Sequence, residues 1–270
     1  MRLLPRRRSV PVENAGAAER VDVDELTLTT YNVWNDPQHA ADRYRAIADL
    51  LSDRKPDVMV FQEITPTAVD VLLAERWMRD GYARAAVVGG VAGGYGMLML
   101  SRVPLSRVTH TRLPTRQSRG FLTAELGLPG AATAVCCIHL DSGKQSSRLR
   151  GWQLRRIFGS LRTAEDAVVL GDFNMRDVEN GRIGPPYCDV WPAIRPREDG
   201  FTEDTSINLM RYDMKDKHRH VRFDRVLLKG DRWTATDIEL LGTEPIAHDL
   251  PRVFPSDHFG VACRLTSRSP

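Results

Sequence analysis

One short stretch of this 270-residue sequence combines residues that could do chemistry. An apolar run, Val168–Leu170, stops at Gly171 and is followed by Asp172 and, two positions later, Asn174. In an extended chain residues two apart point to the same side, so the carboxylate and the amide would be neighbours. Such a pair could activate a water molecule and hold a phosphoryl oxygen. The alternative is an Asp-x-Asn turn that caps a helix beginning near Val178.

Polar residues of the same chemical kind end or interrupt the other predicted strands. They are Asn32 at the end of strand 26–32, Glu63 after strand 57–62, His139 near the end of strand 133–140, Asp224 within strand 221–228, and Asp257 and His258 before strand 260–265. A single residue of this kind is usually a cap or a satisfied core group. Several of them at the ends of strands that share a sheet edge indicate an active site.

Helical periodicity separates several of these strands. The periodic apolar sets are Tyr44, Ile47, Leu50 and Leu51 before Lys55-Pro56; Val69, Leu72, Leu73 and Trp77 after the N-cap signal Thr65-Pro66; and Leu154, Ile157, Phe158 and Leu161. Two further strands are predicted over residues 97–100 and 121–126, whereas residues 201–214 have little period and are predicted to form a loop. The alternation of strands and helices predicts an α/β fold.

Charge is concentrated at the start of the chain. The net charge is +3, and residues 1–20 contain five arginines against two glutamates, so the remainder is formally neutral. A neutral body argues against a broad surface that coats duplex nucleic acid, but it permits a local basic rim around one phosphodiester. The sequence predicts a flexible basic tail over residues 1–24 and one catalytic domain over residues 25–267.

Several function classes are disfavoured by what the sequence lacks. Neither common nucleotide-binding glycine motif occurs, so glycines 89–96 are interpreted as a turning connection. No apolar run approaches the ~18 residues of a membrane span, and the basic N-terminus lacks the apolar stretch of a signal peptide. The four cysteines contain no C-x-x-C pair and are predicted to be reduced and buried. We therefore expect a cytoplasmic protein, and we expect it to be a monomer.

Six ordered motifs resemble those of the endonuclease/exonuclease/phosphatase superfamily. They are Thr-Tyr-Asn (30–32), Gln-Glu (62–63), His-Leu-Asp-Ser (139–142), Gly-Asp-Phe-Asn (171–174), Phe-Asp-Arg (223–225) and Ser-Asp-His (256–258). The resemblance covers residues 26–265 and implies a four-layer α/β sandwich, in which two mostly antiparallel sheets pack face to face with helices outside. Longer versions of four motifs are similar to those of the 5′-tyrosyl-DNA phosphodiesterases, a DNA-repair branch of the superfamily.

The resemblance also implies a metal site and a catalytic base. Glu63 would be the main Mg²⁺ ligand with Asn32 beside it, and Mn²⁺ could substitute, because both ions prefer hard oxygen ligands. Asp257 would support the waters on the metal. Asp172 would orient or deprotonate the attacking water, and Asn174 would donate a hydrogen bond to the substrate phosphate.

The remaining implied roles concern the phosphate. His258, aligned by Asp224, would act on the phosphate oxygens from the other side. His139 and Ser142 would complete the floor of the pocket. Arg176 occupies the place where the tyrosyl-DNA branch uses an arginine near the scissile phosphate, and the alternative is an ordinary exposed arginine after a turn.

Two residues depart from the tyrosyl-DNA branch. Glu203 stands where that branch carries tryptophan, so an apolar wall against the DNA strand would be lost and a negative charge added near an anionic substrate. Trp34 stands where vertebrate members place an aspartate, which removes a second acidic group near the metal.

The leading functional hypothesis is a magnesium-dependent phosphodiesterase that acts on nucleic-acid ends, with 5′-tyrosyl DNA adducts as the best single substrate. The same motifs serve enzymes that act on abasic DNA, sphingomyelin, inositol phosphates or poly(A) tails, so these substrates remain alternatives. No exposed apolar hairpin that would favour a lipid substrate is found in the sequence. A binding module without enzyme activity is the third hypothesis, and the intact set of acids and histidines disfavours it.

Overall fold

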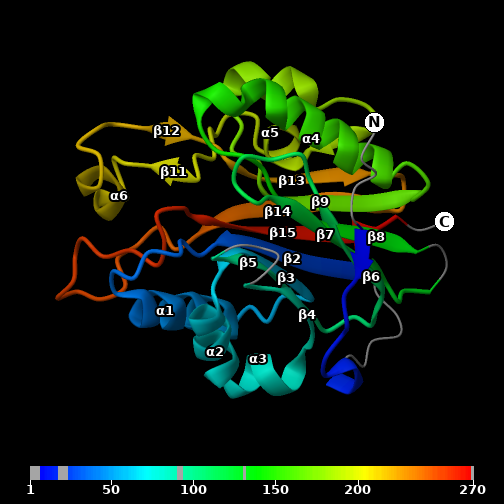
Figure 1. Ribbon diagram of the computed structural model, residues 1–270, viewed down its shortest axis with the longest axis horizontal. Helices are drawn as coiled ribbons and strands as arrows, with labels where there is room; N and C mark the ends of the chain where they lie inside the picture. Colours follow the sequence, from blue (N-terminus) through cyan, green and yellow to red (C-terminus); the bar gives the residue numbers. More distant parts are fainter. Residues whose placement is uncertain (1–6, 18–23, 90–93, 130–131, 269–270) are drawn as a thin grey trace.

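Two β-sheets form the centre of the computed structural model, which describes residues 7–17, 24–89, 94–129 and 132–268 (Figure 1). The first sheet has, in spatial order, β1 (Arg7–Ser9), β6 (Leu105–Arg112), β7 (Gly120–Leu126), β8 (Thr133–His139), β9 (Asp166–Asp172), β13 (Asp224–Lys229) and β10 (Tyr187–Asp189). The second has β14 (Trp233–Leu241), β15 (Gly260–Ser267), β2 (Glu25–Asn32), β3 (Val58–Ile64), β5 (Gly96–Ser101) and β4 (Ala83–Val87). β8 pairs parallel with β9 and β2 with β3, and the other neighbours pair antiparallel.

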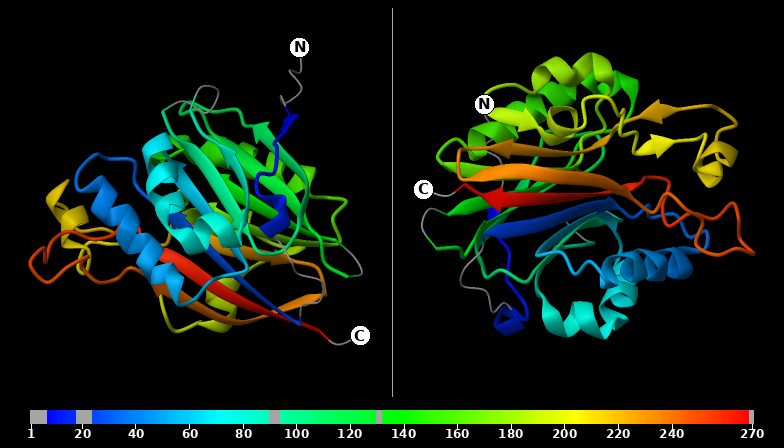
Figure 2. Two further views of the ribbon diagram at one scale, coloured as in Figure 1. Left: turned by 90° about the horizontal axis from the view of Figure 1, so that it is seen from below. Right: turned by 180° about the vertical axis from the view of Figure 1, so that it is seen from behind.

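Helices cover the outer faces of both sheets (Figures 1 and 2). The helices are α1 (Ala40–Ser52), α2 (Pro66–Ala74) and α3 (Arg76–Gly81) on the second sheet, α4 (Ser147–Ser160) and α5 (Val190–Ile194) on the side of the first, and α6 (Leu209–Asp213) in a projecting lobe. Short 3-10 turns occur at η1 (Ala15–Ala17), η3 (Lys144–Ser146) and η4 (Asp177–Arg182). This is the four-layer α/β sandwich that the family resemblance implied.

Three apolar layers hold the sandwich together. The central layer lies between the sheets and contains Leu28 and Val60 of the second sheet against Val135 and Leu170 of the first. The second layer joins the second sheet to α1–α3, and the third joins the first sheet to α4. The central strands therefore bury side chains on both faces, which explains why they are almost continuously apolar.

The predicted helices form with small differences in their ends. In α1 the buried residues Tyr44, Ile47 and Leu51 follow the expected spacing. The Thr65 hydroxyl accepts a hydrogen bond from the Ala68 N–H at 3.1 Å, which confirms the predicted N-cap of α2. The helix expected to continue through Trp77 is instead interrupted at Glu75, and Trp77 lies in α3.

Two predictions around residue 220 are corrected by the structure. The strand expected over residues 221–228 is two strands, β12 (His220–Val221) and β13, because the Thr202 hydroxyl accepts the N–H groups of Phe223 and Asp224 and draws the chain across to the first sheet. Residues 201–214 were predicted to be a loop. They contain β11 (Glu203–Asp204), which pairs antiparallel with β12, and α6.

The N-terminal segment was expected to be flexible through residue 24. Residues 1–6 and 18–23 of that segment lie outside the described residues. Residues 7–17 pack on the domain instead, because β1 pairs with β6 and Val10 is buried in the central layer. Glu13 forms a bridge and an ion pair with Arg84 of β4. The backbone hydrogen bonds of an open sheet edge explain this packing, since they are available to any extended segment that reaches them.

The cysteine and membrane expectations are met in part. Cys136, Cys137 and Cys263 are free and buried, whereas Cys188 is free and exposed, so the prediction of burial is wrong for that residue. Among the described residues, no helix is both long enough and apolar enough to cross a bilayer.

A buried histidine gives the fold a pH-dependent stability. Burial, together with the charges of Arg8 and Arg112, lowers the pKa of His110 on β6 to about 4. The unfolded chain takes up a proton near pH 6.5 while the folded chain does not, so stability falls as the pH is lowered from 6.5 to about 4, by up to about 3 kcal/mol. We expect His110→Gln to reduce this loss in denaturant titrations at pH 7 and pH 4.5. An unchanged difference between the two pH values would contradict the assignment.

Candidate active site

Strand register brings three of the predicted site residues to one place. Across the first sheet, Asp172 of β9 pairs with His139 of β8 on one side and with Asp224 of β13 on the other. Gly171 precedes Asp172 with a φ of 143°, and a Cβ at this position would lie 2.1 Å from the Ile138 carbonyl oxygen. Only glycine fits this close approach between strands, which explains the Gly-Asp pair of the motif.

The second sheet contributes from the facing edge. Asn32 ends β2, and its Nδ2 donates to Asp172 Oδ2 at 3.1 Å, so this hydrogen bond joins the two sheets. Glu63 lies in a bulge of β3 with a φ of 60°, and a bulge changes the direction in which a side chain points. The Ser256 hydroxyl donates to the Asn32 carbonyl oxygen at 2.6 Å and fixes the loop that carries Asp257 and His258.

Asp172 is the most heavily hydrogen-bonded carboxylate of the site. Its Oδ1 accepts from the Asn174 N–H at 2.7 Å, and its Oδ2 accepts from Asn174 Nδ2 at 2.8 Å. His139 Nε2 lies 3.3 Å from the same Oδ2. Burial raises the pKa of Asp172. The hydrogen bond from His139 and the positive charge of His258 lower it by a larger amount, so the net pKa is below its ordinary value. Asp172 is therefore ionised at neutral pH.

His139 is oriented by a residue that the sequence analysis missed. Arg119 Nη1 donates to His139 Nδ1 at 2.9 Å and to the Tyr95 hydroxyl at 2.8 Å. Because arginine can only donate, His139 Nδ1 must be the acceptor and Nε2 carries the proton that faces Asp172. Arg119 immediately precedes β7 and belongs to none of the six motifs, so no sequence pattern marked it.

His258 and Asp224 form a buried pair. His258 Nδ1 lies 2.7 Å from Asp224 Oδ2, as the sequence analysis predicted from the resemblance. Burial lowers the pKa of His258, but the charges of Asp224, Asp257 and Asp172 raise it more, so the net pKa is well above its ordinary value. The imidazole is consequently cationic at neutral pH, and the hydrogen bond to Asp224 leaves its Nε2 for the pocket.

These residues surround a pocket of about 260 Å³. Its lining consists of Glu63, Arg119, Ser142, Gly143, Asp172, Asn174, Arg176, Arg211, Arg219, Phe223, Asp257 and His258. Seven of the ten predicted site residues are in this lining, and the other three, Asn32, His139 and Asp224, lie directly behind it. The lining includes residues from the ends of β3 and β9, from the loop after β8 and from the lobe of β11, α6 and β12. Figure 1 shows this lobe projecting at one end of the sheets.

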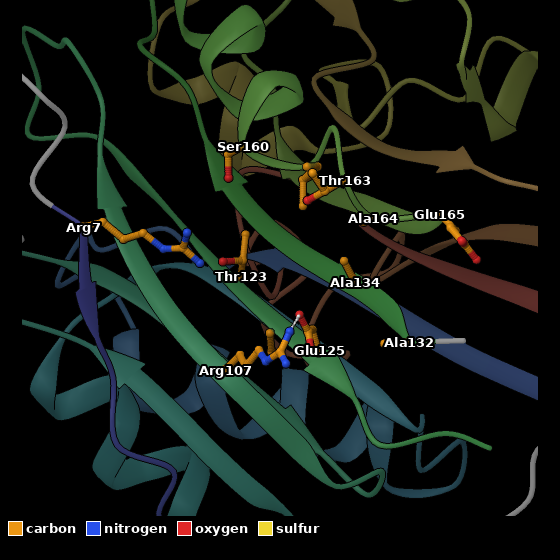
Figure 3. Close-up of a pocket in the computed structure, with 12 residues that line it drawn as sticks. Arg7, Arg107, Thr123, Glu125, Ala132, Ala134, Ser160, Thr163, Ala164 and Glu165 are labelled. Carbon is orange, nitrogen blue, oxygen red and sulfur yellow. Dashed lines mark hydrogen bonds and ion pairs between the residues drawn. The ribbon is translucent and has the colours of Figure 1, made fainter. Parts of the chain in front are cut away.

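A larger hollow lies elsewhere on the molecule and lacks comparable chemistry. It has a volume of about 640 Å³ and lies beside β7 and the loop after α4 (Figure 3). Its charged lining includes Arg7 and Glu165, and Arg107 pairs with Glu125 at 3.2 Å. The other lining residues are alanine, leucine, serine and threonine. None of its described lining residues is a histidine, so we place the active site at the smaller pocket.

The structure changes the interpretation of two residues. Asn174 was expected to donate to the substrate phosphate, but its Nδ2 donates to Asp172 and to the Leu140 carbonyl oxygen, so both amide hydrogens are used within the protein. Asn174 therefore holds Asp172 in place. Arg176 is half-buried and lines the pocket, so it is not the ordinary exposed arginine that the alternative described.

The expectation for Glu203 is wrong. Its side chain is fully buried, and it does not face the substrate as an isolated negative charge. Oε1 lies 2.5 Å from Arg211 Nε, and Oε2 lies 3.1 Å from Arg219 Nε. The two guanidinium groups offset its charge. Trp34, the other departure from the tyrosyl-DNA branch, is buried with the Arg43 guanidinium 4.5 Å from its ring centroid.

Two sets of residues are candidates for holding a metal ion: Asp172 with Asp224 and His258, and Glu63 with Asp257. Asp172, Asp224 and His258 have ligand atoms within 4.8 Å of one another, but these groups already hydrogen-bond to protein partners. Glu63 is different: Asn35 donates only to its Oε2, and no described residue donates to Oε1. Burial and the charge of Glu63 both raise the pKa of Asp257, to about 6. A cation bound here would offset the repulsion between the two carboxylates.

Comparison with known proteins agrees with this geometry. Residues 29–258 match the sequence model of the Endonuclease/Exonuclease/phosphatase family. The chain belongs to this family. It is therefore a metal-dependent hydrolase of phosphoric diesters, as the family resemblance predicted.

Individual relatives and solved structures agree more narrowly. Tyrosyl-DNA phosphodiesterase 2 of Danio rerio is 30% identical over 94% of this chain and 70% of its own length. The Homo sapiens protein of the same name is 28% identical over 89% of this chain and 68% of its own length. The crystal structure of the D. rerio protein complexed with single-strand DNA product superposes with a TM-score of 0.80, at 26% identity, over 90% of this chain and all of that chain.

We expect Asp224 and His258 to act as one unit in this family member. If Asp224 fixes the orientation and charge of His258, either Asp224→Asn or His258→Asn lowers kcat by on the order of a hundredfold or more, and the double variant is little worse than either single variant. The measurement is hydrolysis of a nitrophenyl phosphodiester, with exposed Asp42→Asn as the control. Losses that simply add in the logarithm of kcat would show that the two residues act independently.

Proposed function

We propose that this protein is a Mg²⁺-dependent phosphodiesterase that removes tyrosine from the 5′ end of DNA. The observation that carries the proposal is the pocket itself, in which an ionised acid, Asp172, and a cationic histidine, His258, flank a space bordered by arginines. The similarity to tyrosyl-DNA phosphodiesterase 2 along 94% of the chain supports the choice of substrate. The D. rerio protein whose structure superposes on this chain was crystallised with single-strand DNA product, which supports a single-stranded 5′ end as the substrate.

The ordered hydrogen bonds suggest how water is activated. Asp172 is held by Asn174, Asn32 and His139, so its free lone pairs have a fixed direction. It orients a water molecule toward the phosphorus and takes its proton as the new P–O bond forms. Because the pKa of Asp172 is low, orientation contributes more than basicity. The bond from phosphorus to the phenolic oxygen breaks in line with the attack, and the tyrosine phenolate takes a proton from solvent.

The opposite side of the pocket receives the phosphate charge. His258, held cationic by Asp224, donates through Nε2 to a non-bridging phosphate oxygen. Arg176 contributes a second cationic donor. Ser142 also lines the pocket, but its hydroxyl accepts from Gln117 Nε2 at 2.8 Å and donates to Gln117 Oε1 at 3.1 Å. These donors are in place before the substrate arrives, so little reorganisation is required in the transition state.

Glu63 and Asp257 are the residues that would hold Mg²⁺, with Asn32 behind them. Their oxygen donors suit Mg²⁺ or Mn²⁺ rather than zinc, because no cysteine lines this pocket and both nearby histidines are engaged with protein partners. When bound, the metal would neutralise charge that develops on the phosphate. Asn32 Oδ1 already accepts a hydrogen bond from the Trp34 N–H, so we assign Asn32 mainly to the orientation of Asp172 and only secondarily to the metal.

We infer that a single chain is sufficient for this activity, because every predicted site residue comes from one protomer. The catalytic domain would span residues 25–267 and act as a monomer. The three buried free cysteines are compatible with the reducing cytoplasm, where the enzyme would serve DNA repair.

The substrate assignment is tested by a panel of phosphoesters. We expect turnover of 5′-phosphotyrosyl single-stranded DNA to exceed that of abasic duplex DNA, sphingomyelin and inositol phosphates by on the order of a hundredfold. Asp172→Asn should abolish most of this turnover while leaving the circular dichroism spectrum intact, because a near-isosteric amide can neither accept all the hydrogen bonds that orient Asp172 nor take the proton from water. Faster cleavage of any other panel member would replace the tyrosyl assignment, and full activity of the variant would remove Asp172 from the mechanism.

Metal dependence is tested by removal and restoration. We expect EDTA to eliminate activity and Mg²⁺ or Mn²⁺ to restore it, because the donors are carboxylate oxygens. Glu63→Gln should raise the Mg²⁺ concentration that gives half-maximal activity by at least about tenfold. Undiminished turnover in EDTA would show that no exchangeable metal takes part.

A further inference from the structure

The projecting lobe formed by β11, α6 and β12 contains an unusual buried acid. Glu203 on β11 has no exposed surface, and its two oxygens each approach the Nε atom of a different arginine, Arg211 of α6 and Arg219 before β12. A buried carboxylate is costly unless its charge is offset. Here two arginines share one buried carboxylate, and Arg211 also lies 3.6 Å from Asp257, so among the described residues Arg219 is the arginine that has only this shared partner.

Both arginines keep donors that the protein does not use. Glu203 contacts each guanidinium at Nε, and among the described residues no hydrogen bond involves Arg219 Nη1 or Nη2, or Arg211 Nη2. The Arg219 side chain is 24% exposed, and its Cζ lies 5.9 Å from the ring centroid of Phe223. Both arginines line the pocket. Glu203 therefore fixes both guanidinium groups through their Nε atoms and leaves the unused Nη donors directed away from the carboxylate.

The charge balance of the pocket favours an anionic ligand larger than one phosphate. Four arginines line it against three carboxylates, and His258 adds a further positive charge. Burial and repulsion from Arg211 and Arg176 lower the pKa of Arg219, with partial compensation from Glu203 and Asp257, so the positive charges of both other arginines act on Arg219. Such a group of like charges is stabilised when an anion lies between its members.

We propose that Arg211 and Arg219, positioned by Glu203, bind a second phosphate of the substrate strand, separate from the phosphate that is cleaved. This proposal rests on the proposed phosphodiesterase function and assigns part of its specificity. His258 and Arg176 receive the scissile phosphate, whereas the arginine pair lies on the wall formed by the projecting lobe. Where the tyrosyl-DNA branch carries a tryptophan that offers an apolar surface, this chain has two arginines that bind a negative charge. This chain therefore selects its substrate by the phosphate that follows the first nucleoside.

The test compares two substrates that differ by one phosphate. They are the p-nitrophenyl ester of thymidine 5′-phosphate and the same ester that carries an additional 3′-phosphate. We expect wild-type kcat/KM to be higher for the 3′-phosphorylated ester by on the order of tenfold, mainly through KM, because one charge-assisted contact contributes about 1.5 kcal/mol or more. The preference should decline as salt is raised.

Arg219→Gln is the decisive variant, because Arg211 also lies 3.6 Å from Asp257 and is harder to interpret. We expect Arg219→Gln to bring the ratio of the two kcat/KM values close to one and Arg219→Lys to leave an intermediate ratio. Arg252→Gln removes an exposed arginine that pairs with Asp213 at the end of α6, and it serves as the matched control. Thermal unfolding midpoints establish that each variant is folded.

The outcomes separate this proposal from the proposed function. Equal wild-type turnover of both esters would overturn the second phosphate site alone, and so would an Arg219→Gln loss that is equal for both esters, which would assign Arg219 to the scissile phosphate. Failure to hydrolyse either ester would count against the phosphodiesterase function. In that case calorimetry still decides the site: thymidine 3′,5′-bisphosphate should bind about tenfold more tightly than thymidine 5′-phosphate to wild type, and equally to Arg219→Gln.

Discussion

Two buried carboxylates that face each other across a pair of strands set the constraint on this active site. Asp172 and Asp224 occupy opposite positions in the β9–β13 ladder, and neither is exposed to solvent. Two ionised acids in such surroundings repel each other and lose their hydration. The neighbouring residues offset both costs: His258 pairs with Asp224, while Asn32, Asn174 and His139 hydrogen-bond or approach Asp172. The fold must therefore supply partners from both sheets, and this need explains why the site lies at the edge where the sheets meet.

The same compensation gives the pocket two unlike sides. On one side, acidic oxygens of Glu63 and Asp257 suit a divalent cation. On the other, His258 and a wall of arginines suit the anionic strand. Glu203 shows how far charge compensation decides function, because a carboxylate that would repel DNA in an exposed loop becomes, when buried, an anchor for two arginines. In the proposed second phosphate site, its effect on substrate binding has the opposite sign to that expected from its charge alone.

Much of the central fold could be predicted because its signals are local. Apolar runs such as residues 168–170, the Thr65-Pro66 cap and the spacing of Tyr44 and Ile47 in α1 each depend on near neighbours in the sequence. β4, β6 and β14 were not predicted, and β6 and β14 carry many polar residues that alternate weakly, since one face of an outer strand meets solvent. The N-terminal strand was missed for a related reason: an arginine-rich segment pairs with a sheet edge through its backbone, which the side-chain pattern does not reveal.

The sequence by itself determined which residue types are available for catalysis, and ordered motifs placed all ten predicted residues in or directly behind one pocket. What it could not determine was which atom meets which. Asn174 holds Asp172, Arg119 sets the tautomer of His139, and Glu203 lies beneath two arginines only because strands and turns distant in sequence become adjacent. Hydrogen-bond direction and charge compensation are properties of distances of about 3 Å. Those distances are fixed by strand register and sheet packing, so the tertiary structure alone decided the partners of each functional group.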